Sequence, residues 1–180
     1  MEFTGTVYFD FTDAGSWRLF SLLTRAATEG VRLDLEWVGF PAAGPVDRTA
    51  LTAAVRGLSA HAAVAEPSRR QVVRQALFTL LHRQGDSLDA ELTYRAAAKV
   101  AGLDGDVLLA AIPQTGFTAF ETGYLRAVEA GVAGVPTITR HGPPLRIGTT
   151  PAVEHGPARP RVEVIDRMLE DDGIWELVKP

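Results

Sequence analysis

A carboxylate and a hydroxyl lie three residues apart at Asp13 and Ser16, where an aromatic and β-branched run gives way to a helical pattern. A helix N-terminus presents free N–H groups and a partial positive charge, which favour an acidic side chain there. Residues three apart can face each other on the first turn, and a carboxylate beside a hydroxyl can act as its general base. Asp13 and Ser16 are therefore the candidate catalytic residues.

The same two residues also fit a purely structural role. Thr12 and Asp13 are of the types that cap helices, and such a cap typically contributes about 1 kcal/mol to stability. No histidine lies near Ser16 in the sequence to activate its hydroxyl. The simpler interpretation is that Thr12 or Asp13 caps the helix and that Ser16 exposes its hydroxyl at the helix start; both interpretations stay open at this point.

The chain has 180 residues and no cysteine. This composition excludes disulfides, a thiolate nucleophile, cysteine-ligated zinc and iron–sulfur clusters. The four histidines lie in different segments without metal-ligand spacing, so we predict no metal site. One of them, His82, lies in a largely apolar helical stretch and is expected in the core or lining a pocket.

The charge and hydropathy of the sequence exclude some kinds of binding partner. The net charge is −4 and the arginines are scattered among acids, so we expect no nucleic-acid partner. We interpret Arg69, Arg70 and Arg74 as a solvated helix face, with anion binding by the cluster as the minor alternative. No window approaches the ~18 apolar residues of a membrane span, and the first residues alternate like a strand, so we expect no membrane partner and a cytoplasmic location. The bias towards arginine over lysine is typical of a GC-rich genome and favours a bacterial source.

The spacing of the apolar residues and the positions of glycine and proline predict the helices and strands that position these residues. Residues 6–11 indicate a strand and residues 12–29 a helix, and residues 31–38 alternate with period two. This is a β-α-β unit, in which the first strand is expected to be central in the sheet. Nearly half of the residues are hydrophobic, at 46%, so one well-buried domain over residues 1–180 is expected.

The second half of the pattern predicts a helical block and a hairpin. Helical spacing covers about residues 47–112, with breaks at glycines and a proline. A further helix, from about Glu121 to Ala130, leads to a Gly-Val-Pro segment and a strand at residues 137–140. A turn and a second short strand, residues 145–148, complete a hairpin. Residues 149–160 should be loop, and a last helix is expected at about residues 161–171.

Three stretches together resemble the DsbA-like thioredoxin-fold family, which includes 2-hydroxychromene-2-carboxylate isomerases and kappa-class glutathione transferases. Tyr8-Phe9-Asp10-Phe11 is similar to the strand before the active site, and Ala101-Gly102-Leu103-Asp104 to a stretch of the helical insertion. Ala130 to Thr137, with Gly-Val-Pro-Thr at its end, matches the cis-proline loop. The resemblance implies an α/β, thioredoxin-like fold with a DsbA-type all-helical insertion between the second strand and the cis-proline strand.

The resemblance also places a pocket between the start of the first helix and a cis Val135–Pro136 bond. Thr12, Trp17, Val135 and Pro136 are the ligand-binding residues that it implies. The sequence departs from the family pattern at residues 13–16, where Asp-Ala-Gly-Ser replaces the Cys-x-x-Cys or Ser-Pro-Tyr-Ser tetrapeptide. Thiol–disulfide chemistry therefore does not transfer to this chain.

Three functions follow as hypotheses. The first is a non-redox protein that binds a small molecule or peptide in this pocket, without a cofactor. The second is a cysteine-independent isomerase or a glutathione-dependent transferase, with Asp13 or Ser16 as its polar group. The third is a structural or dimerisation module, so that a homodimer also stays open. A large, polar-ended cavity would favour a ligand, whereas a pocket filled by Trp17 or Phe11 would favour a scaffold.

Overall fold

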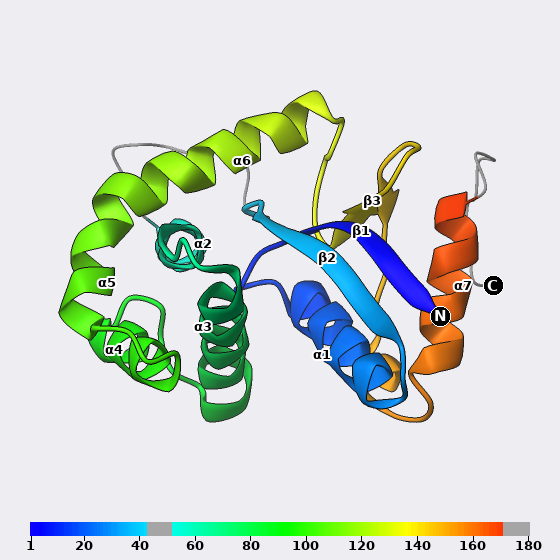
Figure 1. Ribbon diagram of the computed structural model, residues 1–180, viewed down its shortest axis with the longest axis horizontal. Coiled ribbons are helices and arrows are strands. Elements are labelled where there is room, and N and C mark those ends of the chain that lie inside the picture. The colour runs from blue at the N-terminus through cyan, green and yellow to red at the C-terminus, as the bar shows by residue number, and fades with distance from the viewer. Residues whose placement is uncertain (43–51, 171–180) are drawn as a thin grey trace.

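The chain forms a four-stranded mixed sheet packed against helices, with a helical insertion at one side (Figure 1). The computed structural model describes residues 1–42 and 52–170. The strands are β1 (Glu2–Phe9), β2 (Arg32–Gly39), β3 (Thr137–Thr139) and β4 (Leu145–Arg146), in the order β2-β1-β3-β4. β1 pairs parallel to β2 and antiparallel to β3, so the first strand is central, as predicted.

The first strand, helix and second strand form the predicted β-α-β unit. β1 begins four residues earlier than the sequence pattern indicated and ends at Phe9, so that Asp10 lies beyond it. The following helix, α1 (Ala14–Thr28), ends just before Gly30. The φ of Gly30 is +87°, a left-handed conformation that glycine adopts without a steric penalty. The short turn there returns the chain to the sheet as β2.

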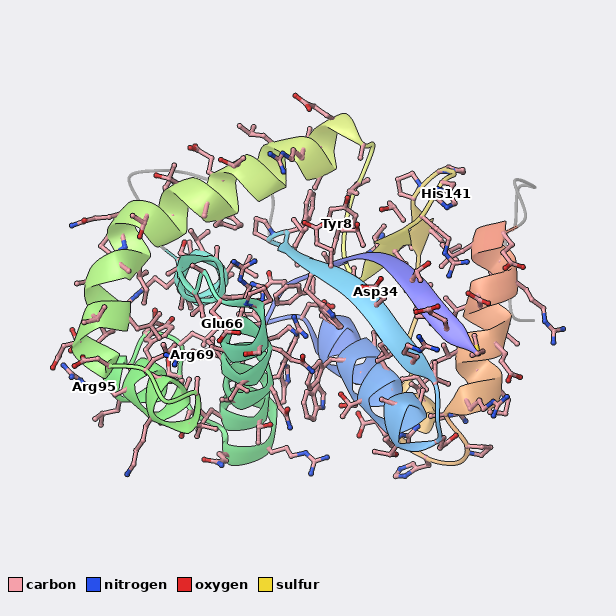
Figure 2. The ribbon with its side chains drawn as sticks, viewed as in Figure 1. Tyr8, Asp34, Glu66, Arg69, Arg95 and His141 are labelled. Carbon is pink, nitrogen blue, oxygen red and sulfur yellow. The ribbon has the colours of Figure 1, made fainter. Side chains whose placement is uncertain are left out.

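One face of the sheet is covered by α1 and α7 (Arg159–Glu170). Side chains alternate along β1, so Phe3 and Val7 point into this layer and Tyr8 points to the other face. Tyr8 and Asp34, both labelled in Figure 2, belong to that other face of the sheet. Tyr8 packs in a small apolar cluster, and Asp34 is exposed. The buried apolar residues of the α1–α7 layer are Phe3, Val7, Leu19, Leu22, Leu23, Ala26, Val31, Ile138, Ala158, Val162, Ile165 and Leu169.

The described chain between β2 and β3 is mostly helical. Its elements are α2 (Ala53–Ala63), α3 (Pro67–Thr79), the π-helical turn η1 (Leu80–Gln84), α4 (Glu91–Val100), α5 (Gly105–Ala111), a second π-helical turn η2 (Ile112–Gly116) and α6 (Phe117–Glu129). The expected start of the insertion at residue 47 lies outside the described residues. α6 begins four residues before the predicted Glu121, because η2 joins it to α5 without a loop.

An aromatic core holds the insertion against the end of β1. Phe9, Phe11 and Phe78 are fully buried. The ring centroids of Phe9 and Phe11 are 5.0 Å apart, and those of Phe11 and Phe78 are 4.8 Å apart. Such pairs contribute about 0.5–1.5 kcal/mol each beyond the burial of their area. The core therefore fixes the segment through which the chain passes from β1 into α1.

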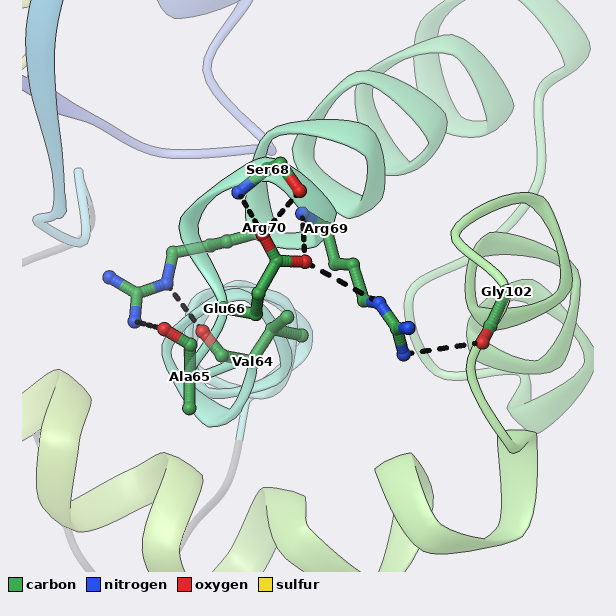
Figure 3. A network of polar contacts seen from close by, with 7 residues as sticks. All are labelled: Val64, Ala65, Glu66, Ser68, Arg69, Arg70 and Gly102. Atoms are coloured by element: carbon green, nitrogen blue, oxygen red, sulfur yellow. Dashed lines mark hydrogen bonds and ion pairs between the residues drawn. The ribbon is translucent and has the colours of Figure 1, made fainter.

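Figure 3 shows the polar network that fixes the start of α3. The carboxylate of Glu66 accepts hydrogen bonds from two backbone N–H groups of the first turn, at 3.0 and 3.1 Å. Arg69 donates to the carbonyl oxygen of Gly102 at 3.5 Å, and Arg70 donates through Nε to that of Val64 at 2.6 Å. The end of α2 and the turn before α5 are thereby tied to the same helix start.

The predicted solvated face at Arg69, Arg70 and Arg74 is wrong for Arg74. This side chain is 9% exposed, and its guanidinium carbon lies 4.3 Å from the ring centroid of Trp37 on β2. An aromatic ring stabilises a cation placed over its face, which partly compensates for the lost hydration. The sequence of α3 alone gave no sign of the ring, because Trp37 belongs to another element.

The C-terminal part differs from the prediction in two places. The expected loop 149–160 contains a short 3-10 turn, η3 (Pro151–Glu154), and α7 begins at Arg159, two residues before its predicted start. The predicted end of this helix at residue 171 lies outside the described residues. Across residues 1–42 and 52–170, no helix is long and apolar enough to cross a membrane.

The close approach of η2 to α2 gives a stability test. A Cβ at Gly116 would lie 2.5 Å from the carbonyl oxygen of Ser59, although the φ of −64° suits any residue. We expect Gly116→Ala to lower the free energy of unfolding by about 1–3 kcal/mol in urea titrations, because the backbone contact must open. Gly148→Ala is the control, since a Cβ there meets nothing within 4 Å. Equal stability of the two variants would contradict this packing.

Candidate functional site

The start of α1 is closed by the side chain of Asp13. Asp13 is the N-cap residue, and its Oδ2 accepts hydrogen bonds from the Ser16 backbone N–H at 2.5 Å and from the Ser16 hydroxyl at 2.8 Å. The carboxylate therefore satisfies a donor that would otherwise lack a partner at the helix start. The structure brings the two predicted catalytic residues together, in the geometry of a cap.

Ser16 is buried, with 1% of its surface exposed, so the expected exposed hydroxyl is wrong. Its Oγ donates to Asp13 and accepts a hydrogen bond from the Asp10 backbone N–H at 3.2 Å. Both hydrogen bonds of this hydroxyl are therefore made inside the fold. These contacts describe a structural serine that links the end of β1 to the first turn of α1.

Asp10 completes this junction and was not singled out from the sequence. It is fully buried, and its Oδ1 accepts from the backbone N–H and the hydroxyl of Thr12, at 2.8 and 2.9 Å. Its Oδ2 accepts from the backbone N–H of Ala42, at 2.8 Å, in the loop after β2. The available signal was an acidic residue inside the aromatic run 8–11, where a buried charge requires several hydrogen bonds.

The cis-proline loop contacts the same turn. The Val135–Pro136 peptide bond is cis, and both residues are buried. A Cβ at Gly15 would lie 2.9 Å from Cδ of Pro136, so the absence of a side chain at Gly15 permits this approach. Thr149 also donates to the carbonyl oxygen of Gly15, at 3.4 Å. The two predicted walls of the ligand pocket are therefore in contact at this point.

Open space lies beside Trp17 instead, in a cavity of about 540 Å³ between α1 and α3. We call it the α1–α3 cavity, and neither Val135 nor Pro136 lines it. Its walls are Trp17, Phe20, Ser21, Thr24 and Arg25 from α1, Gln75 and Thr79 from α3, His82 and Arg83 from η1, and Glu154 and His155 from the segment after β4. Trp17 forms part of the wall and does not fill the space.

His82 connects this cavity to the α1 junction. Its ring stacks on Trp17 with centroids 5.3 Å apart and planes 9° apart, and its Nε2 lies 2.7 Å from the carbonyl oxygen of Phe11. A carbonyl only accepts, so Nε2 carries the proton and Nδ1 of the neutral ring is an acceptor. Burial lowers the pKa of His82 below its usual value, against the opposing effects of the Phe11 carbonyl and the Asp13 carboxylate.

The far end of the cavity is polar. Arg25 donates through its Nη atoms to the carbonyl oxygens of Val153, at 2.7 Å, and Glu154, which fixes η3 against α1. The Nε atom of Arg25 and the hydroxyl of Ser21 are buried, and among the described residues neither has a hydrogen-bond partner. Buried polar groups are nearly always paired, with protein, water or a ligand. Both groups belong to residues that line the cavity.

No group of three or more histidine and acidic side chains within residues 1–42 and 52–170 is arranged to hold a metal ion. Polar side chains reach the α1–α3 cavity from Ser21, Thr24 and Arg25 on α1 and from His82 and Arg83 on η1. Glu154 adds a carboxylate from η3. Arg83 lies over Trp17, with its guanidinium carbon 5.6 Å from the ring centroid. The arrangement suits a flat molecule with acceptor atoms.

The cap at Asp13 gives a test of its structural role. Asp13→Ala leaves the Ser16 backbone N–H without its acceptor, and we expect the free energy of unfolding to fall by about 1–2 kcal/mol in urea titrations. Asp34→Ala, which changes an exposed carboxylate on β2, is the matched control and should change stability by about 0.5 kcal/mol or less. Native-like stability of Asp13→Ala would contradict the assignment of this carboxylate as a cap.

The lowered pKa of His82 gives a pH test. The His82 side chain binds a proton more readily in the unfolded chain than in the folded one. The contribution of neutral His82 to the free energy of unfolding is therefore fully present above about pH 6.5 and is lost as the pH falls below that value. Burial also lowers the pKa of His61, which makes the free energy of unfolding fall with pH in the same direction. We expect acidification from about pH 7.5 to about pH 5 to cost the His82→Gln variant less unfolding free energy than the native chain. His141→Gln, at an exposed position, should follow the native chain; an equal loss in all three would refute the effect.

Comparison with known proteins places this geometry in a known fold. No protein-family model and no curated protein sequence matches the chain. A solved 2-hydroxychromene-2-carboxylate isomerase matches with a TM-score of 0.67 and 14% identity, over 93% of this chain and 94% of that one. The oxidoreductase DsbA from Xylella fastidiosa matches with a TM-score of 0.64 and 15% identity, over 94% and 85% of the two chains.

A third solved structure is the cytosolic disulfide reductase DsbM from Pseudomonas aeruginosa with GSH, at a TM-score of 0.64 and 14% identity, over 93% of this chain and 99% of that one. At identities this low, the matches show a common fold, and the chemistry of this chain must be argued from its own residues. The three matches each cover 93–94% of this chain, so they include the sheet and the helical insertion. The chain therefore has the DsbA-like thioredoxin fold, in a form whose sequence contains no cysteine.

Proposed function

We propose that this protein is a non-redox binding protein that takes a small molecule in the α1–α3 cavity. The observation that carries the proposal is the pair of buried, unpartnered groups, Ser21 Oγ and Arg25 Nε, on residues that line a space of about 540 Å³. Ligand sites are typically ~300–1,000 Å³ in volume, with apolar walls and a few polar groups that orient the ligand. The cavity has this character, with Trp17 and Phe20 as its apolar wall.

The local chemistry at α1 supports a non-redox role. A helix start of this kind can stabilise a thiolate, but this chain has no thiol and uses the position for the Asp13 cap. Asp13 and Ser16 bond to each other, so they act on the site by fixing α1, on which Trp17 sits. A cytoplasmic location is part of the proposal, because a protein without cysteine requires no oxidising compartment.

The side chains favour an aromatic carboxylate as the ligand. Its ring would lie against the Trp17 and Phe20 rings, and its carboxylate would accept hydrogen bonds from Ser21 and Arg25, with Arg83 adding positive charge. Of the four predicted ligand-binding residues, Trp17 lines this cavity. Thr12, Val135 and Pro136 support the α1 junction, and the loop at Pro136 remains the predicted place for an extended peptide.

A second candidate is a cysteine-independent isomerase or a glutathione-dependent transferase. The observation that favours it is the neutral ring of His82, whose Nδ1 can accept a proton in a partly buried site. The fold is shared with an isomerase, and with a reductase whose structure contains GSH. In this candidate His82, and neither Asp13 nor Ser16, is the general base.

Thermal unfolding with a ligand panel tests the first candidate. The panel contains aromatic carboxylates, glutathione and its disulfide. We expect an aromatic carboxylate at about ten times its Kd to raise the Tm by about 3–6 °C, because it binds the folded chain alone. Trp17→Leu and Arg83→Gln should lose the shift. Arg32→Gln, an exposed arginine on β2 with a long 3.7 Å ion pair to Glu2, should keep it.

The same panel separates the two candidates. Glutathione could raise the Tm of the native chain and not that of His82→Gln, and the native chain could show turnover that this variant lacks. These two results together would favour the transferase or isomerase. A chain whose Tm responds to no member of the panel would refute small-molecule binding of this class in the α1–α3 cavity. In that case the structural or dimerisation role becomes the better account.

A further inference from the structure

A second, smaller cavity lies on the other side of the insertion, between β2, α2, α3 and α6. Its volume is about 160 Å³, and its lining includes Glu36, Trp37, His61, Arg70, Phe120 and Arg126. At about 30 Å³ for each water of the liquid, it has room for roughly five waters or one small ion with part of its hydration. We call it the β2–α6 cavity. It shares no lining residue with the α1–α3 cavity.

The inner wall of the β2–α6 cavity carries a histidine without a partner. His61 is 3% exposed and lies between aromatic rings, with centroids 5.3 Å from Phe9 and 6.3 Å from Phe11. Its Nε2 is buried and has no hydrogen-bond partner within the described part of the chain. An imidazole nitrogen buried in this way keeps an unmet hydrogen bond, and His61 is one of the residues that line the cavity.

The charge next to this histidine is positive and uncompensated. Arg74 is stacked on Trp37, and neither an ion pair nor a hydrogen bond joins it to any described residue; its Nε is buried and unpartnered. Burial and the neighbouring Arg70 lower the pKa of Arg74 to about 9. Burial, Arg74 and Arg70 also hold the pKa of His61 well below its usual value. A buried guanidinium without a counterion is costly unless an anion approaches it.

The remaining polar groups of the cavity set its preference. Arg70 uses Nε and Nη2 on the carbonyl oxygens of Val64 and Ala65, at 2.6 and 3.2 Å, which leaves Nη1 for a further acceptor. Arg126 contributes a second guanidinium from α6. The carboxylate in the lining is that of Glu36, which is exposed and accepts from the Thr6 hydroxyl at 3.5 Å. Two arginines line the cavity against one exposed acid, and a third, Arg74, stacks on the lining residue Trp37, so the charge around the cavity is net positive.

We propose that the β2–α6 cavity binds a small oxyanion. His61 Nε2 and the guanidinium groups of Arg70 and Arg126 would donate to its oxygens, and Arg74 beneath Trp37 supplies buried positive charge. Charge-assisted hydrogen bonds from guanidinium groups to oxyanions are among the strong polar contacts in proteins. This site is independent of the proposed ligand in the α1–α3 cavity, and either can fail without the other.

Inorganic phosphate, acetate and sodium chloride at equal ionic strength form the three arms of the test, read by thermal unfolding at about pH 7. We expect phosphate or acetate at about ten times its Kd to raise the Tm by about 3–6 °C beyond chloride. Phosphate as the effective arm identifies a tetrahedral oxyanion, and acetate identifies a carboxylate. Arg126→Gln and Arg74→Met should lose the shift. Arg32→Gln on the same strand as Trp37 is the matched control and should keep it.

Two further measurements separate a bound anion from a general salt effect. In chloride alone, Arg74→Met should unfold at the native Tm or above it, because an unpaired buried charge has been removed. The ¹⁵N signal of the His61 side chain should move on titration with the active anion, while that of the exposed His141 stays in place. No shift beyond chloride in the native chain, or a shift that survives in both Arg126→Gln and Arg74→Met, would overturn the proposal.

Discussion

The start of α1 and the candidate site beside it depend on the hydrogen bonds of the buried Asp10 carboxylate. Its two oxygens accept three hydrogen bonds, from Thr12 after β1 and from Ala42 after β2. Its own backbone N–H donates to Ser16, whose hydroxyl in turn bonds to the cap Asp13. A buried carboxylate that lost one of these donors would leave a desolvated charge without compensation, so the junction holds its three segments as one unit.

The tight junction decides on which side of α1 open space is left. Gly15 lets Pro136 pack directly on the first turn of α1, and this contact closes the space between the two loops at that point. The opposite side of α1 stays open, because α3 is held away from it by the stacked rings of Phe20, Phe78, Trp17 and His82. The insertion therefore does more than cover the sheet: it forms the second wall of a cavity.

Both cavities are places where the insertion faces the sheet unit with unpaired polar groups. Ser21 and Arg25 line the α1–α3 cavity, and each has one polar atom without a partner among the described residues. His61 lines the β2–α6 cavity in the same condition, and Arg74 stacks on Trp37, another residue of that lining. Folded chains rarely retain such groups, since each forgoes hydrogen bonds that water supplied in the unfolded state. These groups lie on residues along the boundary between the insertion and the sheet unit, which is where both proposed sites are placed.

The sequence by itself determined the elements and the class of fold. Period-two alternation at 31–38, the helical spacing of the insertion and the Gly-Val-Pro segment are local signals, and the absence of cysteine follows from composition alone. The sequence also paired Asp13 with Ser16, because two residues that are three positions apart on the first turn of a helix lie close together. It could not show that Ser16 is buried, that Asp10 joins three segments, or that His82 stacks on Trp17. Those facts depend on contacts between residues 32 to 71 positions apart or on burial by other elements, and only the tertiary structure decided them. The burial of Arg74 on α3 has the same cause, since the Trp37 ring on which it stacks belongs to the strand β2.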